Sequence, residues 1–323
     1  MRVVYFHRNK NAGFSINKVT QTVIHDFADK EEFELPCFGA SPQTILRNLW
    51  FVWRHRSKKN INHVTGDVQY AILALRGCKS VLTCHDTVLL DYHKQSRLKR
   101  LILEWMWYRL PLKYATKVVA ISEATKNSLR KYTRRDDIVV IHNAIDPMFH
   151  EGERFPNNIP QILLIGTSGN KNLLRTFDAL KGIKCKVLII GPLSVEQKDS
   201  LNRNKIYYEN SCGLSDEQIL DAYIRCDVVS FISLFEGFGM IIVEANKVGR
   251  PVICSDIPVL REVAGDAALF VNPTDIEDMH RGFEQILKDE DLQQDLVARG
   301  FENAKRFDVK EIQKQWLDFY EVL

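Results

Sequence analysis

Short apolar runs alternate with amphipathic segments along the whole chain of 323 residues. The runs are five or six residues long and many are rich in β-branched side chains, which is typical of strands. In segments between them, such as 276–289, apolar residues recur at helical spacing. Apolar strands alternating with helices predict parallel sheets covered on both faces, here two doubly wound α/β domains. The predicted strands span 2–6, 33–38, 61–65, 80–84, 117–122 and 138–142, then 161–166, 186–191, 205–209, 228–233, 251–255 and 268–272.

The alternation lapses between Ile141 and Gln161, a stretch that holds three prolines and several turn-forming residues. We expect the linker between the domains near 147–160. The predicted domains are residues 1–150 and 151–308, in keeping with a length of roughly two ordinary domains. Residues 309–323 are predicted to form a final helix, with an apolar stripe from Ile312 to Tyr320, that packs back toward the N-terminal domain.

Composition places the chain among ordinary globular proteins. Hydrophobic residues make up 45% and charged residues 26%, enough to bury a core, and a net charge of +3 is too small to indicate a nucleic-acid partner. Seven scattered cysteines without a C-x-x-C pair argue against a disulfide framework and a zinc site. No signal peptide and no long apolar run is apparent, so we expect a cytoplasmic protein.

The segment FEGFGMIIVEA, residues 235–245, places Glu236 and Glu244 on either side of two glycines at a predicted strand–helix junction. Gly237 and Gly239 allow unusual backbone angles and the close approach of a ligand. The backbone N–H groups and dipole of the following helix favour an anion such as phosphate. The two glutamates could accept hydrogen bonds from sugar or ribose hydroxyls. The alternative is a glycine turn with two incidental glutamates.

A second loop of this kind contains Gly166, Thr167, Asn170 and Lys171 and follows the predicted strand 161–166. A lysine near the start of a helix is electrostatically unfavourable unless an anion is close to it. Lys171 is therefore a candidate for neutralising a diphosphate. The alternative is a lysine that only faces solvent.

The first half offers weaker candidates, because its strands are followed by polar residues in less distinctive patterns. His85 follows the strand 80–84 and could hydrogen-bond a substrate or transfer a proton; equally, Asp86 could cap the next helix beside an incidental histidine. His63, Thr65, Gly66 and Asp67 at the end of the strand 61–65 allow the same two interpretations. Gly13 follows the first strand without a G-x-G-x-x-G pattern, which weakens a dinucleotide-binding hypothesis.

Two segments, 47–60 and 97–113, combine tryptophans with arginines and lysines. Such segments resemble the interfacial anchors of membrane-bound proteins. In the alternative interpretation, they are ordinary helices whose aromatic side chains pack on a sheet and whose charges face water.

The motifs together, taken in order along nearly the whole chain, resemble the group 1, or family 4, glycosyltransferases. The ordered segments are HVTGDVQYAILAL, SVLTCHD, VVAISEATK, IHNAIDPMF, GTSGNKNLLRTFDAL, EGFGMIIVE and GRPVICSD…EVAGDAALFVNP. The resemblance implies the GT-B architecture, in which two Rossmann-like domains face each other. The family's E-x7-E motif falls on Glu236 and Glu244.

The resemblance also implies residue roles. Glu236 contacts the donor sugar at the reaction centre, Glu244 holds the nucleotide ribose, and His85 reaches the donor sugar from the other domain. Lys171 binds the diphosphate and the backbone of the glycine loop contacts sugar and phosphate. The implied donor-binding residues are Gly166, Thr167, Asn170, Lys171, Gly237, Phe238, Gly239, Met240 and Glu244, and the implied acceptor side includes Gly13 and Phe14.

The chain departs from the family pattern at three places. Asn170 stands where the family often has an arginine beside the lysine, Ile241 stands where a proline is frequent, and the loop around Gly13 is shortened to AGFS. Neutralisation of the diphosphate would therefore depend more on Lys171 and helix dipoles.

The expected function is that of a retaining glycosyltransferase of surface polysaccharide biosynthesis. It would move a hexose from a nucleotide-diphosphate sugar to a hydroxyl of a glycan or lipid-linked glycan, without a metal or another cofactor. A lipid-linked acceptor favours peripheral contact with the inner face of a membrane through 47–60 and 97–113. Two alternatives remain open: a nucleotide-sugar epimerase on the same fold, and a non-catalytic subunit that binds sugar nucleotides.

Overall fold

The computed structural model describes the chain except for residues 1, 14, 88–89, 91–95 and 154–156. It contains two compact units, one formed by residues 1–144 with 308–323 and the other by 145–307. Each unit has a six-stranded parallel sheet with helices on both faces, so the predicted fold class is confirmed. Residues 147–160, predicted as the linker, fall within the second unit, and 154–156 lie outside the described residues.

The sheet of the first unit has the strand order β2-β1-β3-β4-β5-β6, and every neighbouring pair is parallel. Because β1 pairs with β2 on one side and β3 on the other, the strand order reverses between β1 and β3. The strands are β1 (Val3–His7), β2 (Lys30–Glu34), β3 (Ile61–Thr65), β4 (Ser80–Cys84), β5 (Lys117–Ala120) and β6 (Val139–Val140).

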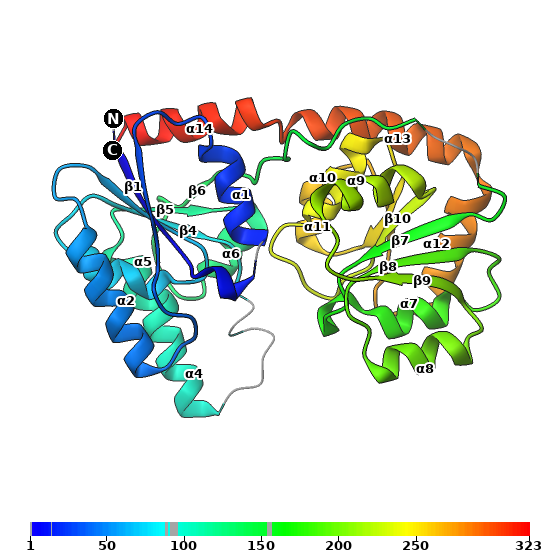
Figure 1. Ribbon diagram of the computed structural model, residues 1–323, viewed down its shortest axis with the longest axis horizontal. Helices are drawn as coiled ribbons and strands as arrows, with labels where there is room; N and C mark the ends of the chain where they lie inside the picture. Colours follow the sequence, from blue (N-terminus) through cyan, green and yellow to red (C-terminus); the bar gives the residue numbers. More distant parts are fainter. Residues whose placement is uncertain (1, 14, 88–89, 91–95, 154–156) are drawn as a thin grey trace. The chain divides into compact units, whose positions relative to one another are not determined.

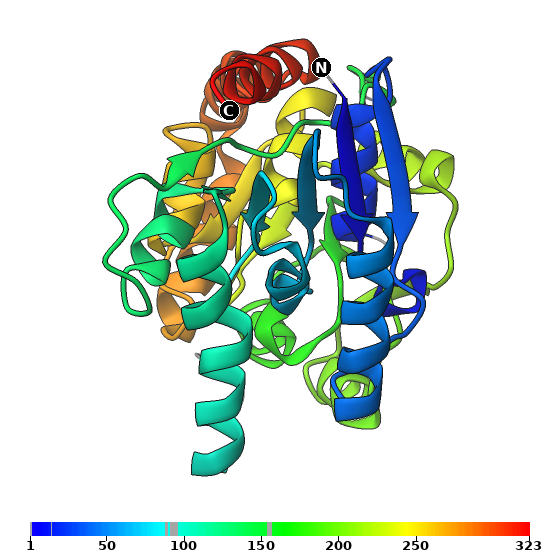
Figure 2. The same ribbon diagram turned by 90° about the vertical axis from the view of Figure 1, so that its left-hand side faces the viewer.

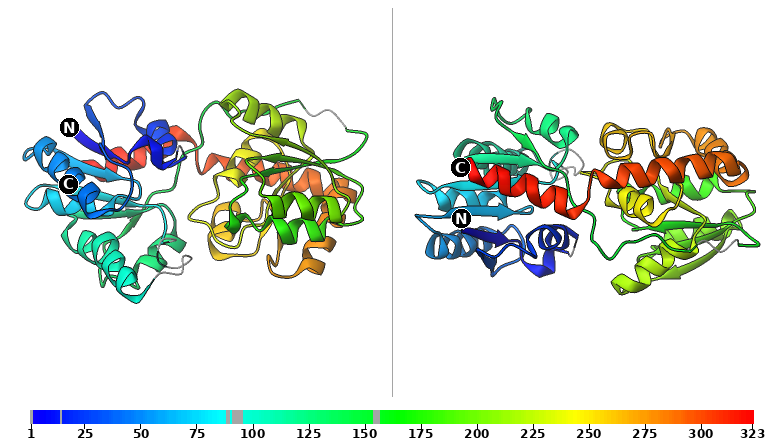
Figure 3. Two further views of the ribbon diagram at one scale, coloured as in Figure 1. Left: turned by 60° about the horizontal axis from the view of Figure 1, so that its bottom comes forward. Right: turned by 90° about the horizontal axis from the view of Figure 1, so that it is seen from above.

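Two helical layers cover this sheet, and each encloses its own core (Figure 1). Helices α1 (Ser15–Ile24) and α14 (Val309–Glu321) pack on one face, against side chains such as Tyr5 and Val119. The view from above in Figure 3 shows α14 lying over this sheet. The opposite face is covered by η2 (Gln69–Leu75), α2 (Pro42–His55) and a continuous run of α4 (Arg97–Leu103), η3 (Glu104–Arg109) and α5 (Leu110–Tyr114). The remaining elements are η1 (Lys10–Ala12) and α6 (Glu123–Leu129).

A buried chain of hydrogen bonds fastens α14 to the sheet. The Tyr5 hydroxyl donates to the Tyr320 hydroxyl at 3.2 Å, and the Tyr320 hydroxyl lies 2.6 Å from His63 Nδ1. The Tyr320 hydroxyl donates its proton to His63 Nδ1, so Nδ1 is the acceptor nitrogen of a neutral imidazole. The imidazole proton is therefore on Nε2, which lies 2.7 Å from Thr83 Oγ1. Burial, assisted by His7 and His85, lowers the pKa of His63 to about 3.

Acidification is expected to destabilise the first unit. The unfolded chain binds a proton at His63 below pH about 6.5, whereas the folded unit does not until pH about 3, so stability falls as the pH drops through this window. Substituting His63→Gln should flatten the dependence between pH 7 and 5 by up to about 1.4 kcal/mol per pH unit. Urea unfolding followed by tryptophan fluorescence reports on this unit alone, because all five tryptophans belong to it. An unchanged slope in the variant would contradict the assignment.

The sheet of the second unit has the order β12-β11-β10-β7-β8-β9, again parallel throughout. Its strand order reverses between β7 and β10. Helices α7 (Leu173–Ala179) and α12 (Ile276–Lys288) cover one face, while α10 (Met240–Val248) packs on β10 and β11 from the other. The strands are β7 (Gln161–Ile165), β8 (Lys186–Ile190), β9 (Tyr207–Ser211), β10 (Val228–Phe231), β11 (Val252–Ser255) and β12 (Leu269–Val271). The other elements are η4 (Gly169–Lys171), α8 (Val195–Arg203), α9 (Asp216–Arg225), α11 (Pro258–Ala264) and α13 (Glu290–Lys305).

Two strand positions differ from prediction, and both belong to sheet edges. The strand predicted at 33–38 lies at Lys30–Glu34, and the one predicted at 205–209 lies at Tyr207–Ser211. Edge strands pair on one side only and remain partly exposed, so charged and polar residues such as Lys30 and Asn210 are tolerated in them. The apolar pattern therefore placed the ends of these two strands two to four residues away from their positions in the structure. No helix in the described ranges is long and apolar enough to cross a membrane.

Candidate active site

The topology of the second sheet points to one place for a ligand. In parallel sheets, ligands bind beyond the carboxyl ends of the strands, at the point where the strand order reverses. Here that point lies between β7 and β10, which are neighbours in space. The loop after β7 contains Lys171, and the loop after β10 contains Glu236. These two loops, which have the most distinctive sequences, therefore lie at the same edge of the second sheet.

The loop after β7 is shaped by a glycine that no other residue could replace without strain. Gly166 has a φ of +88°, and a Cβ there would come within 3.0 Å of Lys171 Cε. The chain then forms the short helix η4, and Asn172 takes the left-handed conformation with φ of 58° before α7 begins. Thr167 connects this loop to the loop after β8, because its hydroxyl donates a hydrogen bond to the Pro192 carbonyl at 2.6 Å.

The loop after β10 turns sharply into α10 at Gly239. This residue has a φ of +117°, and a Cβ would approach Leu260 Cδ2 to 2.8 Å. The adjacent Phe238 is buried and packs edge-to-face on Phe307, with ring centroids 5.6 Å apart. Any contact of Phe238 with a ligand would therefore use its backbone. Met240 is the first residue of α10.

Lys171 and Glu236 join the two loops. Lys171 Nζ lies 2.7 Å from Glu236 Oε1, and the two side chains are 17% and 14% exposed. The same ammonium group lies 4.4 Å from the ring centroid of Phe231, a cation–π contact at the end of β10. A positive and a negative group are thus held together at the edge of the sheet, largely shielded from solvent.

Asn170 contributes to the same junction. Its side-chain amide donates to the Phe235 carbonyl at 3.1 Å and to Glu236 Oε1 at 3.3 Å, and the backbone carbonyl of Asn170 accepts a hydrogen bond from the Leu234 N–H at 2.8 Å. Asn170 therefore positions the loop that carries Glu236. A side-chain amide makes these hydrogen bonds, so positioning the loop does not require a second cation.

Glu244, eight residues beyond Glu236, lies on α10 and is held by a buried tyrosine. Tyr223 on α9 donates its hydroxyl proton to Glu244 Oε2 at 2.7 Å. Burial and the neighbouring Glu244 carboxylate raise the pKa of Tyr223 far above its ordinary value, so the tyrosine stays protonated as a donor. The hydrogen bond therefore fixes one oxygen of the Glu244 carboxylate.

The remaining predicted residues belong to the first unit. His85 follows β4 and is buried, and burial together with the charge of Arg8 lowers its pKa to about 3, so its imidazole is neutral. Its Nε2 finds no hydrogen-bond partner in the part of the chain that the structure describes. Gly13 follows η1 with φ of 104°. Phe14 lies outside the described residues.

Sequence reasoning missed Arg8, which lies directly after β1 where the strand order of the first sheet reverses. Arg8 is 5% exposed; its Nη2 donates to the Gly13 carbonyl at 3.0 Å, and its Nη1 lies 3.4 Å from Asp67 Oδ1. Asp67 follows β3, the neighbour of β1. Each unit thus has a cation after one strand paired with a carboxylate after the adjacent strand. The feature of the sequence that could have indicated Arg8 is its position as a basic residue at the end of the first apolar run.

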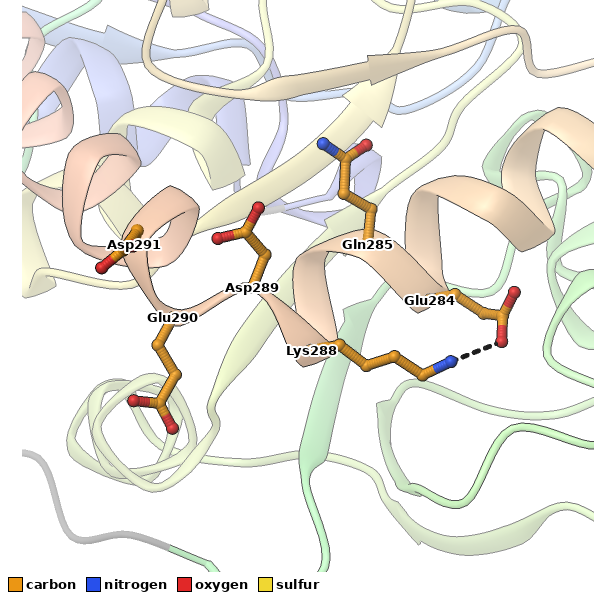
Figure 4. A pocket seen from close by; sticks show the side chains of 6 residues that line it. All are labelled: Glu284, Gln285, Lys288, Asp289, Glu290 and Asp291. Atoms are coloured by element: carbon orange, nitrogen blue, oxygen red, sulfur yellow. Dashed lines mark hydrogen bonds and ion pairs between the residues drawn. The ribbon is translucent and has the colours of Figure 1, made fainter.

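A separate hollow lies between the end of α12 and the start of α13 (Figure 4). Its six lining residues include four acids, and its one lysine, Lys288, already pairs with Glu284 at 2.7 Å. Such a surface repels anionic ligands. Across the described ranges, no three His, Cys, Asp or Glu residues are grouped closely enough to hold a metal ion. The lining residues are Glu284, Gln285, Lys288, Asp289, Glu290 and Asp291.

Comparisons with known proteins identify both halves of the chain. Residues 162–303 match the model of glycosyl transferases group 1, and residues 20–149 match the model of glycosyltransferase family 4. The O-antigen chain mannosyltransferase B of Escherichia coli is 34% identical over 33% of this chain, and the match spans only 28% of that relative's length. The O-antigen chain mannosyltransferase RfbU of Salmonella typhimurium is 24% identical over 84% of this chain and 77% of its own.

Solved structures share the fold at low sequence identity. HepE of Anabaena, crystallised with UDP and glucose, superposes with a TM-score of 0.80 at 17% identity, covering 100% of both chains. A glycosyltransferase from Rickettsia africae gives a TM-score of 0.77 at 18% identity, covering 99% of this chain and 98% of its own. The two family models confirm the resemblance found in the sequence, and the solved structures show the GT-B fold: this chain belongs to the glycosyltransferases of group 1, family 4.

Proposed function

We propose that this glycosyltransferase moves a hexose from a nucleotide-diphosphate sugar to a hydroxyl of a glycan or lipid-linked glycan, with retention of configuration, during assembly of a surface polysaccharide. The observation that carries the proposal is the Lys171–Glu236 pair at 2.7 Å, held where the strand order of the second sheet reverses. Names of relatives support the substrate class, since several are O-antigen mannosyltransferases and HepE was solved with UDP-glucose.

The pair suits the charges that develop as the glycosidic bond breaks. Negative charge grows on the departing diphosphate, and positive charge grows on the sugar ring. Lys171 would oppose the first and Glu236 the second, and each fixed group of this kind can contribute about 3 kcal/mol in a shielded site. Both groups are already held at the edge of the sheet where the donor would bind. Lys171 and backbone N–H groups would neutralise the diphosphate without a metal.

Glu244 would hold the ribose of the donor. Tyr223 occupies one oxygen of its carboxylate and fixes the orientation of the group. The carboxylate, held in this orientation, would accept hydrogen bonds from the two ribose hydroxyls.

The acceptor side would lie at the corresponding edge of the first sheet, around Arg8, Gly13 and Asp67. Arg8 supplies a fixed positive charge suited to the phosphate groups of a lipid-linked acceptor. His85, which burial keeps neutral, would contact a sugar through hydrogen bonds rather than as a cation.

Thermal unfolding with a panel of GDP-, UDP-, ADP- and dTDP-sugars tests the donor class. A donor at about 100 times its dissociation constant stabilises the folded state by about 2.7 kcal/mol, so one base should stand out. Incubation with that donor and a lipid-linked glycan, followed by NMR of the anomeric proton, reports the configuration of the product. An inverted product would refute retention. Conversion of the donor without an acceptor would indicate an epimerase, and binding without turnover would indicate a non-catalytic subunit.

A further inference from the structure

Two helices of the first unit expose complete apolar stripes to solvent. Of the fifteen large apolar side chains that are exposed in the described part of the chain, seven lie on these two helices. Their positions recur at i, i+3, i+4 and i+7 spacing, which places them on one side of each helix. The α2 stripe consists of Leu46, Trp50 and Trp53. The α4 stripe consists of Leu98, Leu101 and Ile102 and continues into η3 with Trp105; the exposed fractions in the two stripes run from 47% to 70%.

The exposed side chains of the two stripes are not part of the hydrophobic core that covers the sheet. Other residues of the same helices, including Leu49 and Val52 on α2 and Leu103 on α4, already pack into the core. Trp107, two residues after Trp105, is buried and donates its indole N–H to the Asp67 carbonyl at 2.9 Å. Of the two interpretations of 47–60 and 97–113, packing of the aromatic side chains on the sheet thus holds for Trp107 but not for the three exposed tryptophans, Trp50, Trp53 and Trp105.

Both helices project from the side of the unit that faces away from α14 (Figures 1 and 2). Large exposed apolar patches are rare on soluble proteins unless they contact a partner or a membrane. The two helices that carry the stripes thus lie on one side of the same unit, the arrangement that contact with a single surface requires.

The charges around the stripes are mostly positive, with Glu104, which pairs with Arg109 beside Trp105, as an exception. Residues 35–66 contain no aspartate or glutamate, and neither does α4. Three of the tryptophans carry an arginine against the ring: Arg54 lies 5.4 Å from the Trp50 centroid, Arg56 lies 4.7 Å from that of Trp53, and Arg109 lies 5.8 Å from that of Trp105. The basic residues beside the stripes are Arg47, Arg54, Arg56, Lys58 and Lys59, and Arg97, Lys99 and Arg100.

We propose that the α2 and α4 stripes dock this protein on the surface of an anionic lipid bilayer. Tryptophan rings insert at the headgroup level, leucine and isoleucine reach the upper acyl chains, and the flanking arginines and lysines meet lipid phosphates. A second copy of the chain is a poorer occupant, because two such faces in a symmetric dimer would bring mainly positive charges together. This proposal goes beyond the proposed function and does not depend on it.

Sedimentation with vesicles tests the proposal without any donor or acceptor. The probes are vesicles of phosphatidylcholine alone and of phosphatidylcholine with about one-third phosphatidylglycerol. We expect the wild type to bind the anionic vesicles, to bind the neutral ones far less, and to be released at about 0.5 M salt. Tryptophan fluorescence should shift to the blue on binding, because three exposed rings leave water. Absence of binding to anionic vesicles would overturn the proposal.

Substitutions locate the contact. The double variant Trp53→Ser/Trp105→Ser, one change in each stripe, should weaken binding at least about tenfold, because two interfacial anchors are lost. Leu317→Ser is the matched control: Leu317 is 48% exposed on α14, against 47% for Trp105, and should leave binding unchanged. Because all three positions are exposed, the folded state should survive, which circular dichroism can check. Equal binding by both variants, or dimers that Trp53→Ser/Trp105→Ser dissociates, would contradict the bilayer assignment.

Discussion

The Glu236→Gln variant is expected to lose at least about 100-fold in turnover while it keeps most of its affinity for the nucleotide sugar. Glutamine preserves the size of the side chain and its ability to accept a hydrogen bond from Asn170, but it removes the negative charge that would offset the sugar ring in the transition state. Lys171 keeps its own charge for the diphosphate. Steady-state kinetics and calorimetric titration separate the two effects, since only the catalytic rate should collapse.

The chain offers a matched control for this variant. Lys186 and Glu209 form a similar pair at 2.8 Å in the same unit, on β8 and the edge strand β9, and Lys186 also lies over an aromatic ring, that of Tyr207 at 5.6 Å. Because this pair is remote from the point where the strand order reverses, Glu209→Gln should retain wild-type turnover. Wild-type turnover in Glu236→Gln, or an equal loss in both variants, would sink the assignment of Glu236.

The Lys171→Met variant should weaken binding of the nucleotide sugar by about 10- to 100-fold, the usual range for the loss of a charge-assisted contact. It should also lower the stability of the second unit, because Glu236 would be left partly buried without its cation. Binding by the wild type should weaken as salt is added, and the variant should show a smaller dependence on salt. Calorimetric titration at two salt concentrations measures both quantities.

Lys186→Met provides the comparison for this loss of charge. It removes the same number of charges from the same unit, so a general electrostatic effect would appear in both variants. Unchanged affinity in Lys171→Met, or the same weakening in Lys186→Met, would show that Lys171 does not bind the diphosphate.

Much of the fold was predictable because the central strands are buried on both faces. Runs such as 80–84 and 228–233 are buried along their length and contain only apolar and small polar residues, without a charge, so the pattern can be recognised in the sequence without any knowledge of neighbouring strands. Edge strands lack this constraint. Lys30 and the charged residues after it belong to β2, which pairs only with β1, and the apolar pattern placed that strand too late.

The candidate site was predictable as a set of residues but not as a geometry. Glu236 and Lys171 each stood out in a glycine-containing loop, yet their contact spans 65 positions and depends on β7 lying next to β10. Sequence reasoning missed Arg8 for the same reason, because its carboxylate partner Asp67 is brought to it only by the pairing of β1 with β3. Nor could spacing separate Trp105 from Trp107, which face solvent and core although they are two residues apart.

The central claim is that the loops after β7 and β10 hold the nucleotide sugar. Hydrogen–deuterium exchange of the wild-type protein, with and without the nucleotide sugar that stabilises it most in the thermal panel, tests this directly. We expect slower exchange of backbone amides in residues 166–172 and 234–244 of the second unit. Protection confined to the acidic hollow at residues 284–291, with none in these two loops, would contradict the account.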